Sequence, residues 1–173
     1  VDPVTVGMDP AALEAVDSLI LAAISDSASP GAALAIGRHG KLVRLRGYGR
    51  LDWTDEAQPA TPSSLWDMAS VTKVSTTTSA AMILAESGRL DLDAPVREYV
   101  PEFAPDNAAG TPITLRQLMS HRAGIIREPP AGHYFDDTGT DLATTVRSMA
   151  GTPQIYPPTT RTKYSNAGIA VVG

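Results

Sequence analysis

Residues 70–88 have the sequence SVTKVSTTTSAAMILAESG, in which Ser70 stands three positions before Lys73 and a long apolar stretch follows. This pattern predicts a helix that begins near Ser70 and ends by Gly88, because glycine is favoured just past a helix end. Residues three apart lie on one face of a helix, so the amine of Lys73 can reach the hydroxyl of Ser70. Residues 80–85 are apolar all round, which predicts that this helix is buried in the centre of the fold.

The pairing of a serine with a lysine is typical of a nucleophilic serine site. A serine hydroxyl is a poor nucleophile until a neighbouring base takes its proton, and a lysine acts as that base when burial or nearby positive charge favours the neutral amine. The unpaired N–H groups at the start of the helix would lie beside Ser70 and stabilise an oxyanion on an attacked carbonyl. About 0.2 Ser-x-x-Lys pairs are expected by chance at this composition, so the pair alone is only mildly informative.

A second motif, Tyr164-Ser165-Asn166, lies far downstream of the first. At this composition the triplet is expected by chance only about 0.004 times. A tyrosine can relay a proton between the serine and a leaving group, and an asparagine carries both a donor and an acceptor that can hold Lys73 and a substrate amide or carbonyl. We therefore predict a site in which Ser70, Lys73 and Tyr164 converge as catalytic residues and Asn166 binds substrate.

Both motifs also have purely structural explanations. Ser70 could cap the helix while Lys73 is an ordinary surface residue of its first turn. The Tyr-Ser-Asn triplet could form a turn that caps the closing apolar run at residues 167–172. The occurrence of both motifs in this order favours the catalytic interpretation.

The two motifs resemble those of the serine β-lactamase and DD-peptidase superfamily, and within it the class C β-lactamase-like branch, which includes many esterases. That branch has Tyr-x-Asn where class A enzymes have Ser-Asp-Asn. The resemblance covers about residue 9 to the end and implies that Ser70 is the acylated nucleophile, that Lys73 and Tyr164 share general-base and general-acid duty, and that Asn166 helps to bind substrate. The other matching segments are PGAALAI at 30–36, HGK at 39–41, GYG at 47–49, SGRLDLDAPV at 87–96, ITLRQLMSH at 113–121 and KYSNAG at 163–168.

The resemblance implies an α/β (α+β) fold of the β-lactamase/transpeptidase type, in which an antiparallel sheet flanked by helices accompanies an all-helical region. Residues 1–69 would hold the N-terminal helix and the first strands, and residues 70–173 the helical region with both motifs. The family's third element, a Lys-Thr-Gly or His-x-Gly triplet on a strand beside the site, does not occur after Asn166. We therefore expect the chain to be the N-terminal portion of a longer protein, with the C-terminal strands and helix supplied by a remaining half as a separate chain.

Local patterns predict the individual elements. Asp9 can cap an amphipathic helix over residues 9–26, and residues 32–38 and 41–48 are predicted strands joined by a tight turn at His39-Gly40. Arginine alternates with apolar residues in the second strand, so we expect its basic side chains to lie on a solvated face that protects a sheet edge. Short helices are predicted at residues 93–99, 114–120 and 141–150, with a surface loop at 122–139.

Composition excludes several classes of function. The chain has 173 residues, of which 43% are hydrophobic and 19% charged, as in soluble globular proteins. Its net charge of −5 argues against a nucleic-acid partner, and the absence of cysteine excludes a disulfide framework and a thiolate nucleophile. No run approaches the roughly 18 apolar residues of a membrane span. Because His39, His121 and His133 lack the spacing of metal ligands, no metal or other cofactor is predicted, and we expect His121 to end a helix.

The sequence thus predicts a serine hydrolase that forms a covalent acyl-enzyme on an ester, β-lactam or D-amino-acid peptide. Its partner would be a small-molecule ester or amide substrate. The alternative is a non-catalytic binding or regulatory protein of the same fold, or a fragment that is inactive without its C-terminal partner. The location stays open between periplasm, secretion and cytoplasm.

Overall fold

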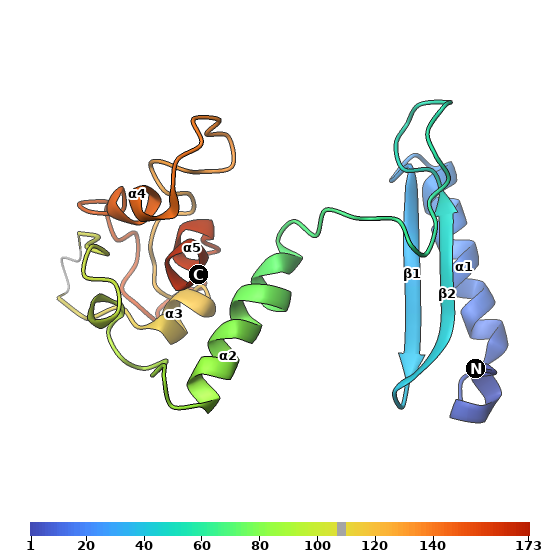
Figure 1. Cartoon of the computed structure of the whole chain (residues 1–173), viewed down its shortest axis with the longest axis horizontal. Coiled ribbons are helices and arrows are strands. Elements are labelled where there is room, and N and C mark those ends of the chain that lie inside the picture. Colours follow the sequence, from blue (N-terminus) through green and yellow to red (C-terminus); the bar gives the residue numbers. More distant parts are fainter. Residues whose placement is uncertain (107–109) are drawn as a thin grey trace. The chain divides into compact units, whose positions relative to one another are not determined.

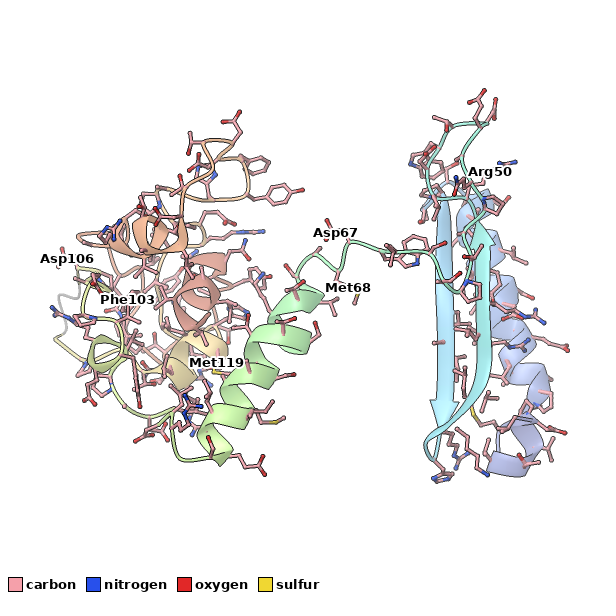
Figure 2. The ribbon with its side chains drawn as sticks, in the orientation of Figure 1. Arg50, Asp67, Met68, Phe103, Asp106 and Met119 are labelled. Carbon is pink, nitrogen blue, oxygen red and sulfur yellow. The ribbon has the colours of Figure 1, made fainter. Side chains whose placement is uncertain are left out.

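The structure is a computed structural model that describes residues 1–106 and 110–173. It divides into two compact units, Val1–Asp67 and Met68–Gly173 (Figure 1). Asp67 and Met68 lie on a segment without helix or strand (Figure 2). The predicted boundary between residues 69 and 70 is close to this division, and its status as a domain boundary stays a prediction.

The first unit consists of a helix and a two-stranded antiparallel sheet. A short 3-10 helix, η1 (Pro3–Val6), precedes α1 (Pro10–Ser25), and β1 (Gly31–Arg38) pairs with β2 (Lys41–Gly49). The side chain of Asp9 caps α1 by accepting a hydrogen bond from the N–H of Ala11 at 2.9 Å. His39 and Gly40 both have positive φ, at 52° and 70°, which suits a two-residue turn that follows the twist of the strands. The predicted helix and hairpin are therefore confirmed.

A buried carboxylate joins α1 to β2. The Oδ2 atom of Asp17 lies 3.1 Å from Nη1 of Arg44 and 2.8 Å from Nη1 of Arg46, and its Oδ1 atom accepts a hydrogen bond from the hydroxyl of Tyr48 at 2.5 Å. Burial raises the pKa of the Tyr48 phenol, and its hydrogen bond to Asp17 adds to the effect. Arg44, Arg46 and Tyr48 alternate along β2 and so share the face that meets the helix.

The prediction that the arginines of β2 lie on a solvated, edge-protecting face is therefore wrong for Arg44. Arg46, whose side chain is 56% exposed, is solvated as predicted and also pairs with Asp17. The side chain of Arg44 is only 15% exposed, and both guanidinium groups neutralise Asp17. Asp17 follows Leu13 by one helical turn and shares its buried face of α1. An acidic residue on the apolar face of a helix is thus the reason that basic residues occupy the facing side of the strand.

The second unit is helical. Its elements are η2, a π-helical segment (Lys73–Thr78), α2 (Ser79–Glu86), the 3-10 helix η3 (Val96–Glu98), α3 (Leu115–Met119), α4 (Leu142–Arg147) and α5 (Asn166–Val172). Backbone over residues 71–86 is continuously helical, which confirms the predicted helix after Ser70. The helices expected at 114–120 and 141–150 are confirmed with shorter bounds, and residues 93–99 contain only the single turn of η3. The segment 122–139 has no helix or strand, as predicted, but it is not wholly a surface loop, because Ala123 and Ile125 are buried in the core.

The prediction that residues 80–85 are buried is wrong in the described part of the chain. Ala81 is buried, but the side chains of Met82 and Ile83 are 61% and 62% exposed. The reason is that the core of this unit forms elsewhere, around α3 and α5. Its fully buried members include Val96, Phe103, Leu118, Ile125, Met149 and Ala167.

Caps fix the ends of the two core helices. Thr114 begins α3 with a reciprocal capping box, in which its hydroxyl accepts from the N–H of Gln117 and its own N–H donates to Oε1 of Gln117. Ser165 begins α5, because its Oγ accepts a hydrogen bond from the N–H of Gly168 at 2.9 Å. Tyr164 immediately precedes this cap, so packing of α5 against the core determines where its phenol lies.

Replacing Asp17 with alanine is expected to lower the free energy of unfolding by about 3 kcal/mol, because Arg44 would stay largely buried without its counter-charge. Urea unfolding of the complete gene product, monitored by circular dichroism, measures this loss of stability. The matched control is Asp93→Ala, which breaks the ion pair between Asp93 and Arg116, whose side chains are 66% and 59% exposed. This variant is expected to lose less than about 1 kcal/mol. Equal losses in the two variants would contradict the assigned role of Asp17.

Candidate active site

Ser70 lies in a tight turn that opens the long helix. Three consecutive hydrogen bonds join residues three apart: the N–H of Val71 donates to the carbonyl of Met68 at 2.8 Å, Thr72 to Ala69 at 3.1 Å, and Lys73 to Ser70 at 3.2 Å. In such a turn the side chains of residues i and i+3 nearly eclipse each other. This backbone geometry therefore directs the side chain of Lys73 over that of Ser70.

The residue before the serine has an unusual backbone conformation. Ala69 has a φ of 41°, in the left-handed region that residues with a β-carbon rarely adopt. Such conformations persist only where the surrounding structure imposes them, and they concentrate at functional sites. The strained residue lies directly beside the predicted nucleophile.

Two donors converge on the hydroxyl oxygen of Ser70. Nζ of Lys73 donates to Oγ of Ser70 at 3.0 Å, and the hydroxyl of Tyr164 donates to the same oxygen at 2.8 Å. Nζ of Lys73 also lies 5.2 Å from the centroid of the Tyr164 ring. Loss of a proton from either donor would convert it into an acceptor for the serine proton. The structure thus brings the three residues together, and their catalytic roles stay a prediction.

Positive charge surrounds the Tyr164 phenol. The side-chain interaction with Lys73 is the largest cause that lowers the pKa of this phenol from its ordinary value, followed by the hydrogen bond to Ser70, while desolvation opposes the shift. Cζ of Arg127 lies 5.6 Å from the ring centroid and contributes a smaller effect of the same sign. Tyr164 is 38% exposed, so solvent reaches part of its side chain.

Asn166 lies at the start of α5 with its amide group turned toward Glu128. Its Nδ2 atom donates to Oε1 of Glu128 at 2.6 Å, and its Oδ1 atom is buried with no hydrogen-bond partner among the described residues. The predicted contact between Asn166 and Lys73 is not formed, because Oδ1, the atom of Asn166 that could accept from the Lys73 ammonium, is buried without a partner. No local pattern in the sequence indicated Glu128 as the partner of the amide. The predicted role of Asn166 in substrate binding stays a prediction.

The N–H groups at the start of the helix differ from the prediction. Those of Val71, Thr72 and Lys73 all donate to backbone carbonyls within the tight turn. They are therefore not free to stabilise an oxyanion, and the N–H of Ser70 is the remaining candidate on this turn. The same hydrogen bonds between residues three apart that bring Lys73 over Ser70 also use these N–H donors.

His121 lies at the site, a position that the sequence did not reveal. As predicted, it follows the end of α3, but its ring also lies against the phenol of Tyr164, with 4.4 Å between the centroids and 36° between the planes. Burial and, to a smaller extent, the charge of Lys73 lower the pKa of its imidazole from the ordinary value, which favours the neutral ring. The only signal in the sequence was the position of His121 at the end of the segment 113–121.

Within residues 1–106 and 110–173, no group of three or more His, Asp or Glu residues is arranged to hold a metal ion. The described helices also include none with the length and apolar character needed to cross a membrane.

Comparisons with known proteins agree on a family and a fold. The family model for β-lactamase matches residues 16–173. The esterase EstB of Burkholderia gladioli is 30% identical over 181 residues, which span 96% of this chain and 45% of EstB. Protein Flp of Staphylococcus aureus (strain MW2) is 29% identical over 159 residues, which span 91% of this chain and 32% of Flp. The chain thus spans less than half of the length of these curated relatives.

Two solved structures have a similar fold. EstCE1, described as a hydrolase with promiscuous acyltransferase activity, has a TM-score of 0.78 at 26% identity, covering 92% of this chain and 45% of EstCE1. The D-amino acid amidase of Ochrobactrum anthropi SV3 has a TM-score of 0.73 at 24% identity, covering 92% of this chain and 43% of the amidase. The predicted β-lactamase/transpeptidase-like fold is confirmed by these likenesses.

The acidity of Tyr164 can be measured directly. In protein carrying 13C at the tyrosine Cζ positions, the resonance that disappears in Tyr164→Phe is expected to titrate below the ordinary pKa of about 10. Lys73→Met is expected to move this pKa upward, because it removes the largest cause of the lowering while keeping a side chain of similar length.

Lys163→Met is the matched control, because Lys163 is a sequence neighbour of Tyr164 that does not contribute to the shift. It is expected to leave the titration unchanged. A Tyr164 resonance that does not respond to Lys73→Met would contradict the coupling between the amine and the phenol.

Proposed function

We propose that this chain, which belongs to the β-lactamase family, carries the nucleophile of a serine hydrolase. The hydrolase would work through a covalent acyl-enzyme. The observation that supports this most is the convergence of an amine and a phenol on one serine oxygen, at 3.0 Å and 2.8 Å, the phenol coming from a segment 94 residues away. A simple helix cap would not require a tyrosine from the far end of the chain on its hydroxyl. The exposure of Ser70 supports access for a substrate carbonyl.

In the proposed reaction, Oγ of Ser70 attacks the carbonyl carbon of the substrate. The serine proton passes to Lys73 as a neutral amine or to Tyr164 as a phenolate, and the new C–O bond forms as the oxyanion develops. The oxyanion then collapses, the bond to the leaving group breaks, and the leaving group takes a proton from the same pair. Water repeats these steps on the acyl-enzyme, which frees Ser70 and releases the acid.

The proposed substrates share one carbonyl chemistry. Esters, β-lactams and D-amino-acid peptides all present a carbonyl whose leaving group needs a proton, and one acyl-enzyme route serves all three. The relatives include an esterase and a D-amino acid amidase. Asn166 is the proposed binding residue, because it lies two positions after Tyr164 and its side-chain amide carries both a donor and an acceptor for a substrate amide.

We further propose that residues outside this chain complete the site. The family's third element does not occur after Asn166 in this sequence, and the chain spans 45% of EstB and 45% of EstCE1. Met82 and Ile83 on α2 are apolar and more than half exposed, and the remainder of the protein would cover them. This remainder is the expected C-terminal partner of the chain.

Covalent labelling tests the nucleophile. The complete gene product is expected to react with a fluorophosphonate probe and with a fluorescent penicillin, and mass mapping is expected to find the adduct on Ser70. Ser70→Ala is expected to abolish labelling, because it removes the oxygen on which the amine and the phenol converge. Lys73→Ala is expected to slow labelling by about 100-fold or more, because the proposed base is removed.

Two matched variants control this experiment. Ser75→Ala removes a hydroxyl one turn farther along the helix, where it bonds the carbonyl of Val71, and Lys41→Ala removes a lysine at the start of β2. Both are expected to label at the wild-type rate. Absence of labelling in the wild type, under conditions that label a known serine hydrolase, would favour a binding or regulatory protein of the same fold.

A further inference from the structure

His121 contacts the Tyr164 segment at three points. The backbone carbonyl of His121 accepts a hydrogen bond from the N–H of Lys163 at 2.8 Å, and its Nδ1 atom accepts one from the N–H of Ser165 at 3.2 Å. Between these two bonds, the imidazole lies against the phenol ring of Tyr164. Lys163 and Ser165, on either side of Tyr164, are thus both hydrogen-bonded to His121, and the His121 ring contacts Tyr164 itself.

We propose that His121 is a positioning residue that holds the Tyr164 phenol on the hydroxyl of Ser70. This inference rests on the proposed function, because it assigns His121 to the reaction in which Tyr164 would move a proton. His121 acts through Tyr164, because the hydrogen bonds to the serine oxygen come from Tyr164 and Lys73.

The backbone of His121 supports a specific role. Its φ is 57°, in the left-handed region, and it follows Ser120, the residue that caps the end of α3. A non-glycine residue seldom adopts this conformation unless surrounding contacts impose it. Here the cap of α3 imposes it, because the N–H of His121 donates to the carbonyl of Leu118 at 3.1 Å and the N–H of Arg122 to that of Gln117 at 2.7 Å. The end of the core helix thus fixes the backbone from which the His121 ring reaches Tyr164.

The far side of the same segment is fixed by another residue. The hydroxyl of Ser165 donates to the carbonyl of Ile126 at 2.7 Å and accepts from the N–H of Gly168 at 2.9 Å. Ser165 therefore cannot move to follow a displaced tyrosine without losing its own bonds. Without the acceptor on His121, the N–H of Ser165 would lose its bond while the Ser165 side chain stays held. The peptide unit between Tyr164 and Ser165 could then rotate and carry the phenol away from the hydroxyl of Ser70.

The chemistry of the ring requires its neutral form. Nδ1 accepts a hydrogen bond, so the proton of a neutral imidazole resides on Nε2. A phenylalanine can reproduce the ring contact with Tyr164 but not the acceptor. An asparagine can reproduce the acceptor, since its Oδ1 occupies a place similar to Nδ1, and it tolerates left-handed backbone better than most residues.

These two variants form the test. His121→Phe is expected to slow labelling of Ser70 by a fluorophosphonate by about 10- to 100-fold, because a displaced phenol no longer meets the serine oxygen. His121→Asn is expected to label within about 3-fold of the wild type, because the acceptor for the Ser165 N–H is retained. Both rates are measured on the complete gene product, with thermal melting to confirm that each variant is folded.

A second readout does not depend on labelling. In His121→Phe the 13C resonance of Tyr164 is expected to titrate closer to the ordinary tyrosine pKa of about 10, because the phenol leaves Lys73 and Ser70. In His121→Asn it is expected to keep its lowered pKa. A role confined to general stability would change the melting temperature without moving this resonance.

His39 provides the matched control. It also has a left-handed backbone, with a φ of 52°, but lies in the turn between β1 and β2. His39→Phe and His39→Asn are expected to change neither labelling nor the Tyr164 titration.

The outcomes separate the two proposals. Lack of labelling in the wild type contradicts the proposed function. The Tyr164 titration then still tests whether His121 positions the phenol. Wild-type behaviour of His121→Phe in both readouts overturns the role of His121, and so does an equal loss in His121→Asn and His121→Phe. Should His121→Phe fail to fold, folded His121→Asn decides: wild-type labelling with a lowered Tyr164 pKa supports the role, and slow labelling overturns it.

Discussion

The hydroxyl oxygen of Ser70 accepts hydrogen bonds from Lys73 and Tyr164, and much of the second unit serves to make these two bonds possible. The bond to Lys73 is local, since it follows from a tight turn that places residues three apart over each other. The bond to Tyr164 is not local, because Tyr164 and Ser70 are 94 residues apart in the sequence. It requires the start of α5 to lie close to the start of the helix that follows Ser70. The first bond depends on backbone geometry and the second on the packing of a core.

That core explains why the phenol is so firmly placed. Leu118 of α3 and Ala167 of α5 are both almost fully buried, and the residues that follow α3 and precede α5 are therefore held close together. His121 and Tyr164 are those residues, and the hydrogen bonds between their segments are formed by backbone groups that would otherwise be unpaired. Apolar packing within the unit thus determines where the polar groups of the site lie.

The sequence predicted what depends on short-range chemistry. The cap at Asp9, the turn at His39-Gly40 and the helix after Ser70 all follow from rules that involve neighbouring residues, and the rarity of Tyr-Ser-Asn indicated that Tyr164 belongs with Ser70. What the sequence did not reveal depends on partners that are far away along the chain: the arginines of β2 face Asp17, the amide of Asn166 binds Glu128, and the ring of His121 lies on Tyr164. Periodicity predicts which face of an element is apolar, but it does not identify the charged residue on the facing element. The exposure of Met82 shows the same limit. An apolar run predicts that its side chains are covered, but it does not identify the part of the protein that covers them.

Ser165 stands between Tyr164 and Asn166, and its hydroxyl caps α5. Its two neighbours bond elsewhere, Tyr164 to Ser70 and Asn166 to Glu128. The middle position of the triplet therefore meets a different requirement from the outer two. A substitution there that lacks a side-chain acceptor would weaken the helix end by about 1 kcal/mol and loosen the tie to Ile126, although every atom that bonds the hydroxyl of Ser70 would be unchanged.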